Sequence, residues 1–451
     1  MTNLQDQISG VVLSPGSPDY DRARTVWNAM VDRRPRLIVR CAGPDDVAAA
    51  IRYARDNDLE IGIRCGGHSV VGHAMPDDGL VIDLTAMNAV TVDPGRRRAT
   101  VKGGAMLGAL DRASQPYGLA TTAGNVSHTG VGGLTLGGGM GWLARQHGLT
   151  CDNVVSFEVV TAEGRTVRAS AEENPELFWG LRGGGGNFGV VTDFEFQLHP
   201  VAGPTTQAIL MFPLATAAAA MRGWRDLAAS VPRQATMTAW VGDVGPEPQV
   251  HLGFVWVGEQ AGLAELLATL RSIGRPADEQ VREMSYLELQ QMDDVAVESH
   301  SYRRYWKGHF CQELPDAAIE AFILRGAPDG RGDGLPYASL QAYGGAIADV
   351  PDEATAFSQR DTFVEFVSAS RWTEPAEDEM RMAAGRRYGA SIAPYASGAY
   401  VNALTDEGSA GVQRAYGTEK LVRLTALKDT WDPDNVFHLN HNIPPSAAVE
   451  R

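Results

Sequence analysis

The glycine-rich run from residue 130 to residue 141 limits what this chain can fold into more than any other stretch. Seven of its twelve residues are glycine, which is too many for the interior of a regular helix or strand. Val131, Leu134 and Met140 are interspersed among them, and such apolar residues are not typical of a disordered linker. Backbone without side chains at this density predicts close packing against a partner, for example a phosphate group bound by backbone N–H groups.

Two more segments have the same character. In the segment 63–73, Gly66 and Gly67 precede His68, so the chain can turn sharply there or admit a flat group beside the imidazole. Taken alone, these residues are equally consistent with a turn that holds a solvated histidine. Four consecutive glycines at 183–186 lead into an alternating strand. The strand–turn–helix setting of a Rossmann G-x-G-x-x-G does not surround the glycines, and a Walker A sequence is absent.

Charge and cysteine usage exclude several classes of protein. The net charge of −16 argues against nucleic acid binding, which requires clustered Lys and Arg. The cysteines have no C-x-x-C spacing, so neither a zinc site nor a disulfide framework is expected; they are Cys41, Cys65, Cys151 and Cys311. No basic region with a following apolar run begins the chain, and no run of about 18 apolar residues occurs. We therefore expect a cytoplasmic protein without a membrane anchor.

The pattern of elements predicts two domains of an α+β protein. Short strands and helices alternate up to residue 203, and the segment 204–395 has longer elements. Its predicted strands are 235–243, 249–257, 337–347 and 362–370, and its predicted helices are 214–230, 260–273, 315–325 and 375–392. These strands look half-buried, so we expect one antiparallel sheet with helices on its other face. The domains are thus 1–203 and 204–395, with a C-terminal segment, 396–451, that returns to the first domain.

Five segments in this order resemble one family. They are RCGGHSVVGH at 64–73, SHTGVGGLTLGGGMGWLARQHGLTCDN at 127–153, ELFWGLRGGGGNFGVVT at 176–192, GAYVN at 398–402 and DPDNVFHLNHNIPP at 432–445. The family is the berberine bridge enzyme-like FAD-linked oxidases of the vanillyl-alcohol-oxidase superfamily, near the branch of 6-hydroxy-D-nicotine oxidase and bacterial polyketide-tailoring oxidases. The resemblance implies a two-lobed PCMH-type FAD-binding domain in 1–203, with its core at about 33–202, and a substrate domain in 204–395.

The resemblance also implies how FAD is bound. His68 matches the histidine that bonds the 8α-methyl group of the flavin. Val126 stands where members with a second, cysteinyl link have cysteine, so a single covalent link through His68 is expected. Cys151 does not match the linking position, and we interpret it as a buried thiol near the cofactor. The other expected FAD contacts are Arg64, Gly66, Gly67, Ser69, Gly72, His73, Gly124, Ser127, His128, Thr129, Gly132, Gly133, Gly137, Gly138, Gly139, Gly141, Trp142, Asp152, Asn153, Val154, Gly186, Asn187, Gly189, Val191, Asn402, Asn440 and Asn442.

The catalytic residues are predicted less directly. Tyr400 lies in the family's Tyr-x-Asn segment; it would serve as a base if its pKa were lowered, or it is a structural aromatic residue. Alternation along the strand from 337 places Ser339, Gln341 and Tyr343 on one face, where the family's substrate domain meets the flavin. Ser339 and Gln341 offer hydrogen bonds and no base. The segment 302–310 either lines the pocket with basic and aromatic side chains or crosses the surface.

An oxidase is the function that these expectations favour. Hydride would pass from a C–H next to O or N of a small aromatic, polyketide or N-heterocyclic substrate to FAD, and O₂ would be reduced to H₂O₂. The alternatives are a flavin-dependent oxidative cyclase or oxygenase, a carbohydrate oxidase, which a single FAD link disfavours, and a flavin-binding protein without turnover. The expected partners are a small-molecule substrate and O₂, with no metal, nucleic acid or membrane. Oligomeric state and substrate identity do not follow from the sequence.

Overall fold

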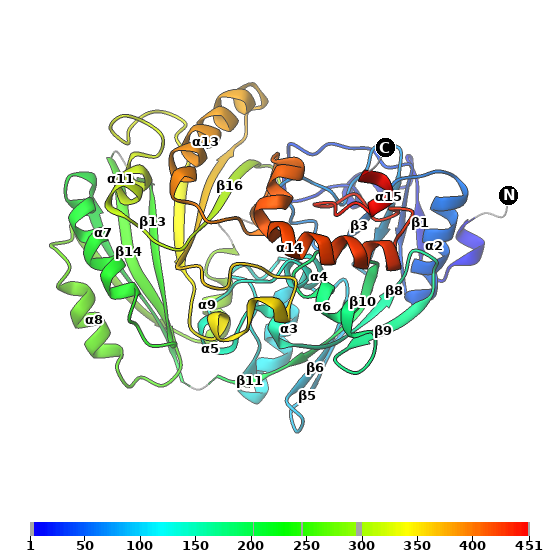
Figure 1. Ribbon diagram of the computed structural model, residues 1–451, viewed down its shortest axis with the longest axis horizontal. Coiled ribbons are helices and arrows are strands. Elements are labelled where there is room, and N and C mark those ends of the chain that lie inside the picture. The colour runs from blue at the N-terminus through cyan, green and yellow to red at the C-terminus, as the bar shows by residue number, and fades with distance from the viewer. Residues whose placement is uncertain (1–3, 202, 245–246, 295–299, 450–451) are drawn as a thin grey trace.

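In the part of the chain that the structure describes, the strands form four sheets, of four, five, two and seven strands; Figure 1 shows their arrangement. The computed structural model describes residues 4–201, 203–244, 247–294 and 300–449. Residues 1–3 and 450–451 lie outside this part. Residues 1–3 begin the N-terminal stretch in which the sequence shows no signal-peptide pattern. The seven-stranded sheet and its helices form one side of the molecule, and the glycine-rich segments lie with the other sheets on the opposite side.

The four-stranded sheet positions the Gly-Gly-His turn. Its order is β1-β2-β4-β3, with β1 antiparallel and the others parallel; the bounds are β1 Val11–Leu13, β2 Leu37–Arg40, β3 Ile61–Arg64 and β4 Leu80–Asp83. Helix α2 (Pro44–Asp56) covers it and begins with proline in its first turn followed by two aspartates, residues that favour a helix start. The turn follows the carboxyl end of β3, the edge of a parallel sheet where ligands commonly bind.

The five-stranded sheet supports the two long glycine segments. It is antiparallel, in the order β5-β6-β10-β8-β9; the bounds are β5 Val90–Asp93, β6 Arg98–Lys102, β8 Val154–Val160, β9 Thr166–Ser170 and β10 Val190–Gln197. Strands β8 and β9 form an antiparallel hairpin. Helices α3 (Leu107–Ser114), α4 (Val131–Leu136) and α6 (Pro175–Leu181) lie nearby. The four glycines at 183–186 lead into β10 as expected.

The seven-stranded sheet is antiparallel throughout, in the order β15-β12-β14-β13-β17-β18-β16. Its strands are β12 Thr205–Pro213, β13 Ala235–Val244, β14 Glu247–Val257, β15 Asp278–Met284, β16 Arg303–Cys311, β17 Tyr337–Ala342 and β18 Val364–Trp372. Helices α7 (Leu214–Ala228), α8 (Leu263–Arg271), α11 (Asp316–Leu324) and α13 (Asp378–Ile392) cover one face (Figure 1). The expected α+β class and the antiparallel sheet with helices on one face are confirmed.

Alternation along the strands gives this sheet two different faces. In β17, Ala338 and Leu340 are buried against the helices, whereas Ser339 and Gln341 face the glycine-rich side. The aliphatic core beneath the helices therefore fixes which polar side chains face away from it, since a slip of one residue would bury them.

The C-terminal segment returns to the glycine-rich side. It contains η7 (Val401–Ala403), α14 (Gly408–Trp431) and α15 (Ser446–Val449). The ammonium of Lys428 is fully buried, where it pairs with Asp432 at 2.7 Å and donates to the carbonyl of Asn187 at 2.9 Å. The N–H of Ile443 donates to the side chain of Asn187 at 3.0 Å. These contacts hold the chain end against the loop that contains the four consecutive glycines.

Two local expectations from the sequence were wrong, and a third was confirmed. The sequence also suggests a helix at about 19–32, but only α1 (Tyr20–Ala23) forms, because the chain turns after it and the N–H of Trp27 bonds the carbonyl of Gly67. A helix suggested at about 417–430 is confirmed as the second segment of α14, and a preceding helical segment from Gly408 joins it across a kink at Gly417, whose φ of 71° is not helical. The glycine-rich run does contain a helix, α4, which is short and packs closely on the carbonyl of Gly103.

The remaining elements connect these layers. They are η1 Leu4–Gln7, η2 Gln115–Tyr117, β7 Leu119–Ala120, α5 Ala144–His147, η3 Thr150–Asn153, β11 His199–Pro200, α9 Tyr286–Gln291, α12 Ala346–Asp349, η4 Asp352–Ala354, η5 Pro375–Glu377 and η6 Ala393–Tyr395. Within the described ranges, none of the helices is both long and apolar enough to cross a bilayer, and no group of His, Cys, Asp and Glu is arranged to hold a metal ion.

Candidate functional site

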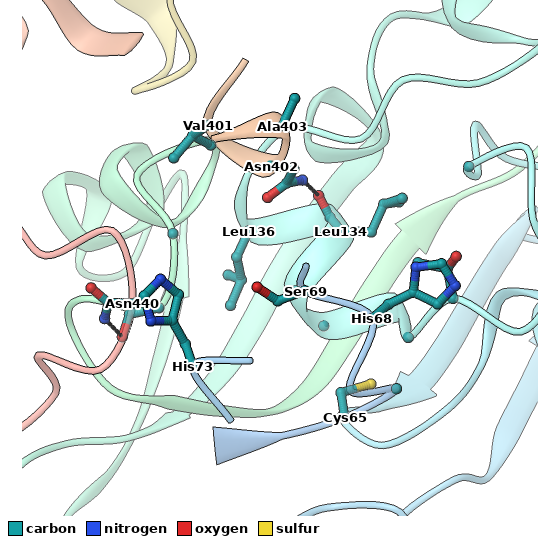
Figure 2. Close-up of a pocket in the computed structure, with 18 of the residues that line it drawn as sticks. Cys65, His68, Ser69, His73, Leu134, Leu136, Val401, Asn402, Ala403 and Asn440 are labelled. Carbon is teal, nitrogen blue, oxygen red and sulfur yellow. Dashed lines mark hydrogen bonds between the residues drawn. The ribbon is translucent and has the colours of Figure 1, made fainter. Parts of the chain in front are cut away.

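A cavity of about 570 Å³ lies between the glycine-rich segments and the open face of the seven-stranded sheet. The turn after β3, helix α4, the loop 185–191 and strands β16, β17 and β18 all contribute to its walls, together with the C-terminal stretches 400–403 and 439–441. Figure 2 shows part of this wall, with Ser69 between His68 and His73 and with Asn402 and Asn440 approaching from the C-terminal segment. Its size is typical of a small-molecule or cofactor site.

His68 is held in one orientation on this wall. Its imidazole stacks on the indole of Trp27 with ring centroids 4.1 Å apart and planes inclined by 16°. Its Nε2 lies 3.2 Å from Nδ1 of His128. Burial, followed by the charges of the neighbouring His128 and Arg304, lowers the pKa of His68 to about 3. The imidazole is therefore neutral at physiological pH and has a lone pair to offer an electrophile.

The glycines at the cavity divide into two groups. A Cβ built on Gly133 or on Gly186 would meet no atom within 4 Å and would project toward the cavity that both residues line. At Gly66 and Gly130 a Cβ would instead collide with the other segment, 2.5 Å from N of Gly130 and 2.4 Å from N of Gly66. The first group keeps space for a bound group, and the second lets the Gly-Gly-His turn pack directly on the glycine-rich run.

Several polar atoms on the wall are buried without a hydrogen-bond partner among the described residues. They are Nε2 of His73, Oδ1 of Asn125, Nε2 of Gln341 and Oδ1 of Asn440. Buried polar groups are normally satisfied, so donors and acceptors gathered in one cavity point to a polar ligand. Together with the neutral His68 and the open space at Gly133 and Gly186, they fit a large cofactor such as the expected FAD.

Glu365, which sequence reasoning missed, lies on the substrate-domain wall. It is the β18 residue opposite Gln341 of β17, lines the cavity and is only 7% exposed. Burial raises the pKa of its carboxyl group to about 7, although the hydroxyl of Tyr343 donates to Oε2 at 2.8 Å. A carboxylate with a pKa near neutrality is suited to proton transfer. The sequence did contain a signal, since Glu365 alternates with Val367 and Ala369 in a buried strand.

Tyr400 also lines the cavity, with its hydroxyl group fixed from two sides. The N–H of Gly139 and Nδ2 of Asn402 both donate to this oxygen at 2.8 Å. Burial, followed by the charge of Glu365, raises the pKa of Tyr400 well above the usual range of a phenol. The phenol is therefore protonated at neutral pH, which is the reverse of the lowered pKa that a tyrosine base requires.

The structure brings 18 of the expected site residues together on the cavity wall. They are His68, Gly66, Gly67, Ser69, His73, Gly124, Thr129, Gly132, Gly133, Gly186, Asn187, Gly189, Val191, Ser339, Gln341, Tyr400, Asn402 and Asn440. Val126, at the position of the second link in other family members, lines the cavity as well. Residues from six separate stretches of the chain thus meet at one place.

The remaining expected residues lie behind the wall. They are Arg64, Gly72, Ser127, His128, Gly137, Gly138, Gly139, Gly141, Trp142, Asp152, Asn153, Val154 and Asn442. Asp152, for example, forms a buried ion pair with Arg360 at 2.7 Å, and the N–H of Gly139 bonds Tyr400. Gly141 packs against the carbonyl of Ala123, where no side chain fits. These residues support the wall and do not form it.

Of the segment 302–310, Trp306 lines the cavity and the basic residues do not. Arg303 pairs with Asp378, and Lys307 pairs with Glu407 at 2.8 Å. The guanidinium of Arg304 lies 4.0 Å from the centroid of Trp27, on which His68 also stacks. The two cysteines nearest the glycine-rich segments also differ. Cys65 lines the cavity, whereas Cys151 is fully buried behind it.

Comparison with known proteins places the chain among flavoproteins. Residues 35–170 match the family model of the FAD binding domain, and residues 399–444 match the model described as berberine and berberine like. The chain is 32% identical to the FAD-linked oxidoreductase YgaK of Bacillus subtilis (strain 168), over 97% of this chain and 98% of that protein.

The chain is also similar to an oxidase along nearly the whole length of both proteins. The chain is 31% identical to (R)-6-hydroxynicotine oxidase of Paenarthrobacter nicotinovorans, over 98% of each protein. The crystal structure of 6-hydroxy-D-nicotine oxidase from Arthrobacter nicotinovorans has a TM-score of 0.86 to this structure at 28% identity, over 99% of both chains.

Proposed function

The chain belongs to the berberine bridge enzyme-like FAD-linked oxidoreductases, and we propose from this premise that it oxidises a small aromatic, polyketide or N-heterocyclic substrate with production of H₂O₂. As a member of this family it is an FAD-dependent oxidase. When bound, FAD supplies the acceptor for the hydride and passes the electron pair to O₂. The observation that supports the proposal best is that a neutral His68 and a carboxyl group with a pKa of about 7, Glu365, line the same cavity.

The glycine-rich side would hold the cofactor. His68 would form the single covalent bond to it, since Val126 has no group with which to form the second. The open backbone at Gly133 and Gly186 would lie along its flat and phosphate-bearing parts, where a side chain would intrude. Asn440, which already donates to the carbonyl of Gly186 at 3.3 Å, would use its buried Oδ1, which has no partner in the described ranges, toward the cofactor.

The sheet side would bind the substrate. Trp306 and Tyr337 offer aromatic surfaces, and Val367 and Ala369 an aliphatic one. Among the described lining residues there is a single carboxyl group, Glu365, and no Lys or Arg. A flat, largely apolar substrate with one O–H or N–H donor therefore fits the wall better than an anion or a sugar, which needs many hydrogen-bond partners.

Glu365 would act as the base in this reaction. Its carboxylate would take the O–H or N–H proton of the substrate as the adjacent C–H loses hydride. Tyr343 would hold the carboxylate through its hydrogen bond of 2.8 Å. Gln341 would orient the substrate, because its Oε1 accepts from Asn125 at 3.1 Å while its Nε2 has no partner in the described part of the chain. Tyr400 would remain protonated and donate.

We also propose that FAD binding and substrate binding belong to different segments of the chain. Residues 1–203 and 396–451 would form the FAD-binding unit and residues 204–395 the substrate-binding unit. In support, the core beneath the seven-stranded sheet is made only of residues between 208 and 395. The core of the glycine-rich side combines residues from 90 to 198 with residues 399–443. Five residues of the substrate-binding unit also pack into this core where the two units meet, namely Phe310, Tyr343, Ile347, Ala356 and Phe357.

Anaerobic mixing tests the proposed reaction. Phenols, aromatic alcohols, polyketides, N-heterocyclic amines and oligosaccharides would each be added to the holoenzyme without O₂, and bleaching of the flavin absorbance followed. We expect bleaching by an aromatic or N-heterocyclic compound, recovery in air, and one H₂O₂ per turnover. Turnover in ¹⁸O₂ should leave the organic product unlabelled. Labelled product would contradict a simple oxidase, and bleaching only by sugars would contradict the substrate class.

A further inference from the structure

The surroundings of His68 contain a second histidine that the proposed reaction does not use. His128 places its Nδ1 3.2 Å from Nε2 of His68, with the ring centroids 5.0 Å apart. The two residues come from different glycine-rich segments, 60 positions apart in the chain. His128 lies behind the cavity wall, so it is not a contact for a substrate.

The backbone around His128 is fixed independently of its side chain. The first residues of α3 donate to the carbonyls on either side of it, Leu107 to Thr129 at 2.9 Å and Gly108 to Ser127 at 2.8 Å. Ser127 is further bonded to Asp294, through its N–H at 2.9 Å and its hydroxyl at 2.6 Å. These contacts hold the backbone from which the side chain of His128 projects.

The ring of His68 is fixed as well. Trp27 stacks on its face, and the guanidinium of Arg304 lies 4.0 Å from the centroid of the same indole. Trp27 stacks on one face of the ring and Nε2 lies 3.2 Å from His128, so Nδ1 is the ring nitrogen without a side-chain partner among the described residues; the ring's remaining hydrogen bond is to the backbone of His68 itself. The pKa of about 3 means that His68 bears one ring proton at neutral pH, and that proton can lie on only one of the two nitrogens.

We propose that His128 is the positioning residue for the covalent attachment of FAD to His68, accepting the proton of Nε2 so that Nδ1 is the nucleophile. The inference rests on the proposed attachment at His68. A hydrogen bond from Nε2 to Nδ1 of His128 selects the tautomer whose lone pair is on Nδ1. As Nδ1 forms its bond, Nε2 becomes acidic, and His128 takes up the proton that would otherwise leave a buried cation.

The overall reaction balances with the co-reactant of the oxidase. A C–H bond of the 8α-methyl group and the N–H bond of His68 break, and one C–N bond forms. The methyl carbon loses two electrons, which the flavin ring receives together with two protons. O₂ then takes both electrons and both protons and becomes H₂O₂. The net change is flavin-CH₃ plus imidazole N–H plus O₂ to flavin-CH₂-imidazole plus H₂O₂, and His128 returns to its original protonation state.

The test follows the rate of attachment and not the activity of the finished enzyme. Full-length protein produced in a flavin-starved host is mixed with FAD in air, and FAD that resists denaturation is measured against time. His128→Ala should slow attachment by about 100-fold or more, the range of general acid–base catalysis. Non-covalent FAD binding, measured by ultrafiltration before attachment, should change by only a few-fold.

A conservative variant and a rescue separate proton transfer from packing. In His128→Asn the amide oxygen can take the place of Nδ1 as an acceptor but cannot accept the proton, so attachment should be slower than in the wild type and faster than in His128→Ala. Added imidazole should accelerate attachment in His128→Ala and not in the wild type. His251→Gln, which removes a half-buried imidazole of β14 that neither lines the cavity nor contacts His68, is the matched control and should attach FAD at the wild-type rate.

Attachment at the wild-type rate in His128→Ala would overturn the inference. So would equal losses of attachment and of non-covalent binding without rescue by imidazole, because they would show a packing role. His68→Ala distinguishes this failure from that of the proposed attachment. If His68→Ala still acquires covalent FAD, the attachment site is wrong; if it acquires none while His128→Ala is unaffected, only the role of His128 is wrong.

Discussion

Replacing Glu365 by glutamine should lower activity and raise stability in the same variant, and this combination separates a catalytic carboxylate from a structural one. The carboxyl group is 7% exposed and its pKa is about 7 instead of the ordinary 4.5. The folded state therefore holds the proton between pH 4.5 and 7, where the unfolded chain has lost it. By linkage, the stability of the wild type falls as pH rises through this range.

The magnitude follows from the two pKa values. The difference between the two pKa values corresponds to about 3 kcal/mol. Above pH 7 the ionised carboxylate lowers the stability of the wild type by this full amount, and below pH 4.5 it does not lower it at all. Glutamine is not ionised, and its oxygen can still accept from Tyr343. Glu365→Gln should therefore be more stable than the wild type by up to about 3 kcal/mol at pH 8 and equally stable at pH 4. Without the base, kcat should fall by about 100-fold or more.

The assay is steady-state oxidation together with thermal unfolding from pH 4 to pH 8.5. Wild-type kcat should rise as pH increases through about 7, where Glu365 ionises, and the variant should lack this rise. Asp111→Asn is the matched control, because burial raises the pKa of Asp111 to about 7 as well, away from the cavity wall. It should gain stability in the same way and keep the activity. A fully active Glu365→Gln variant would refute the assignment of the base.

Three further changes test other parts of the site. Gly186→Val should reduce the FAD content of the protein, because the added side chain fills cavity space. Gly43→Val is the control, because Gly43 also has free space around it but lies outside the cavity, and it should leave the FAD content unchanged. Equal absorbance at 450 nm per protein in the two variants would contradict the cofactor placement. Tyr400→Phe should lower kcat by at most about 10-fold, which corresponds to the loss of one hydrogen bond, and kcat should still rise as pH increases through about 7. Loss of this pH dependence would instead make Tyr400 the base. Arg360→Met should destabilise the protein by about 3–5 kcal/mol, because it leaves Asp152 buried without its partner at 2.7 Å; an unchanged melting temperature would contradict the role of this pair.

The alternation of side chains along one strand was enough to predict which residues of that strand face the cavity. The alternation in β17 placed Ser339 and Gln341 on the cavity face, as the structure has them. Tyr343, expected on the same face, lies beyond the end of the strand at Ala342 and bonds Glu365 instead of lining the cavity. Glu365 itself depends on which strand pairs with β17 and in what register, and such non-local pairing is not encoded in the local pattern of either strand.

The resemblance to the family indicated which glycine-rich segments form the site, but not which glycines face the cavity and which allow close packing. Gly133 and Gly186 open onto the cavity, while Gly141 accommodates the carbonyl of Ala123 and Gly139 bonds Tyr400. A glycine needed for a ligand and a glycine needed for close packing look alike in a sequence, because both only require the absence of Cβ. The contact of Trp27 with His68 likewise joins segments that no local pattern relates.

Intact mass spectrometry of the denatured protein, with peptide mapping, tests the central claim most directly. The account predicts one retained FAD per chain, bound to the peptide that contains His68, and none in His68→Ala. Retained FAD in His68→Ala, a link to any other residue, or a wild-type protein that releases all of its FAD on denaturation would contradict it.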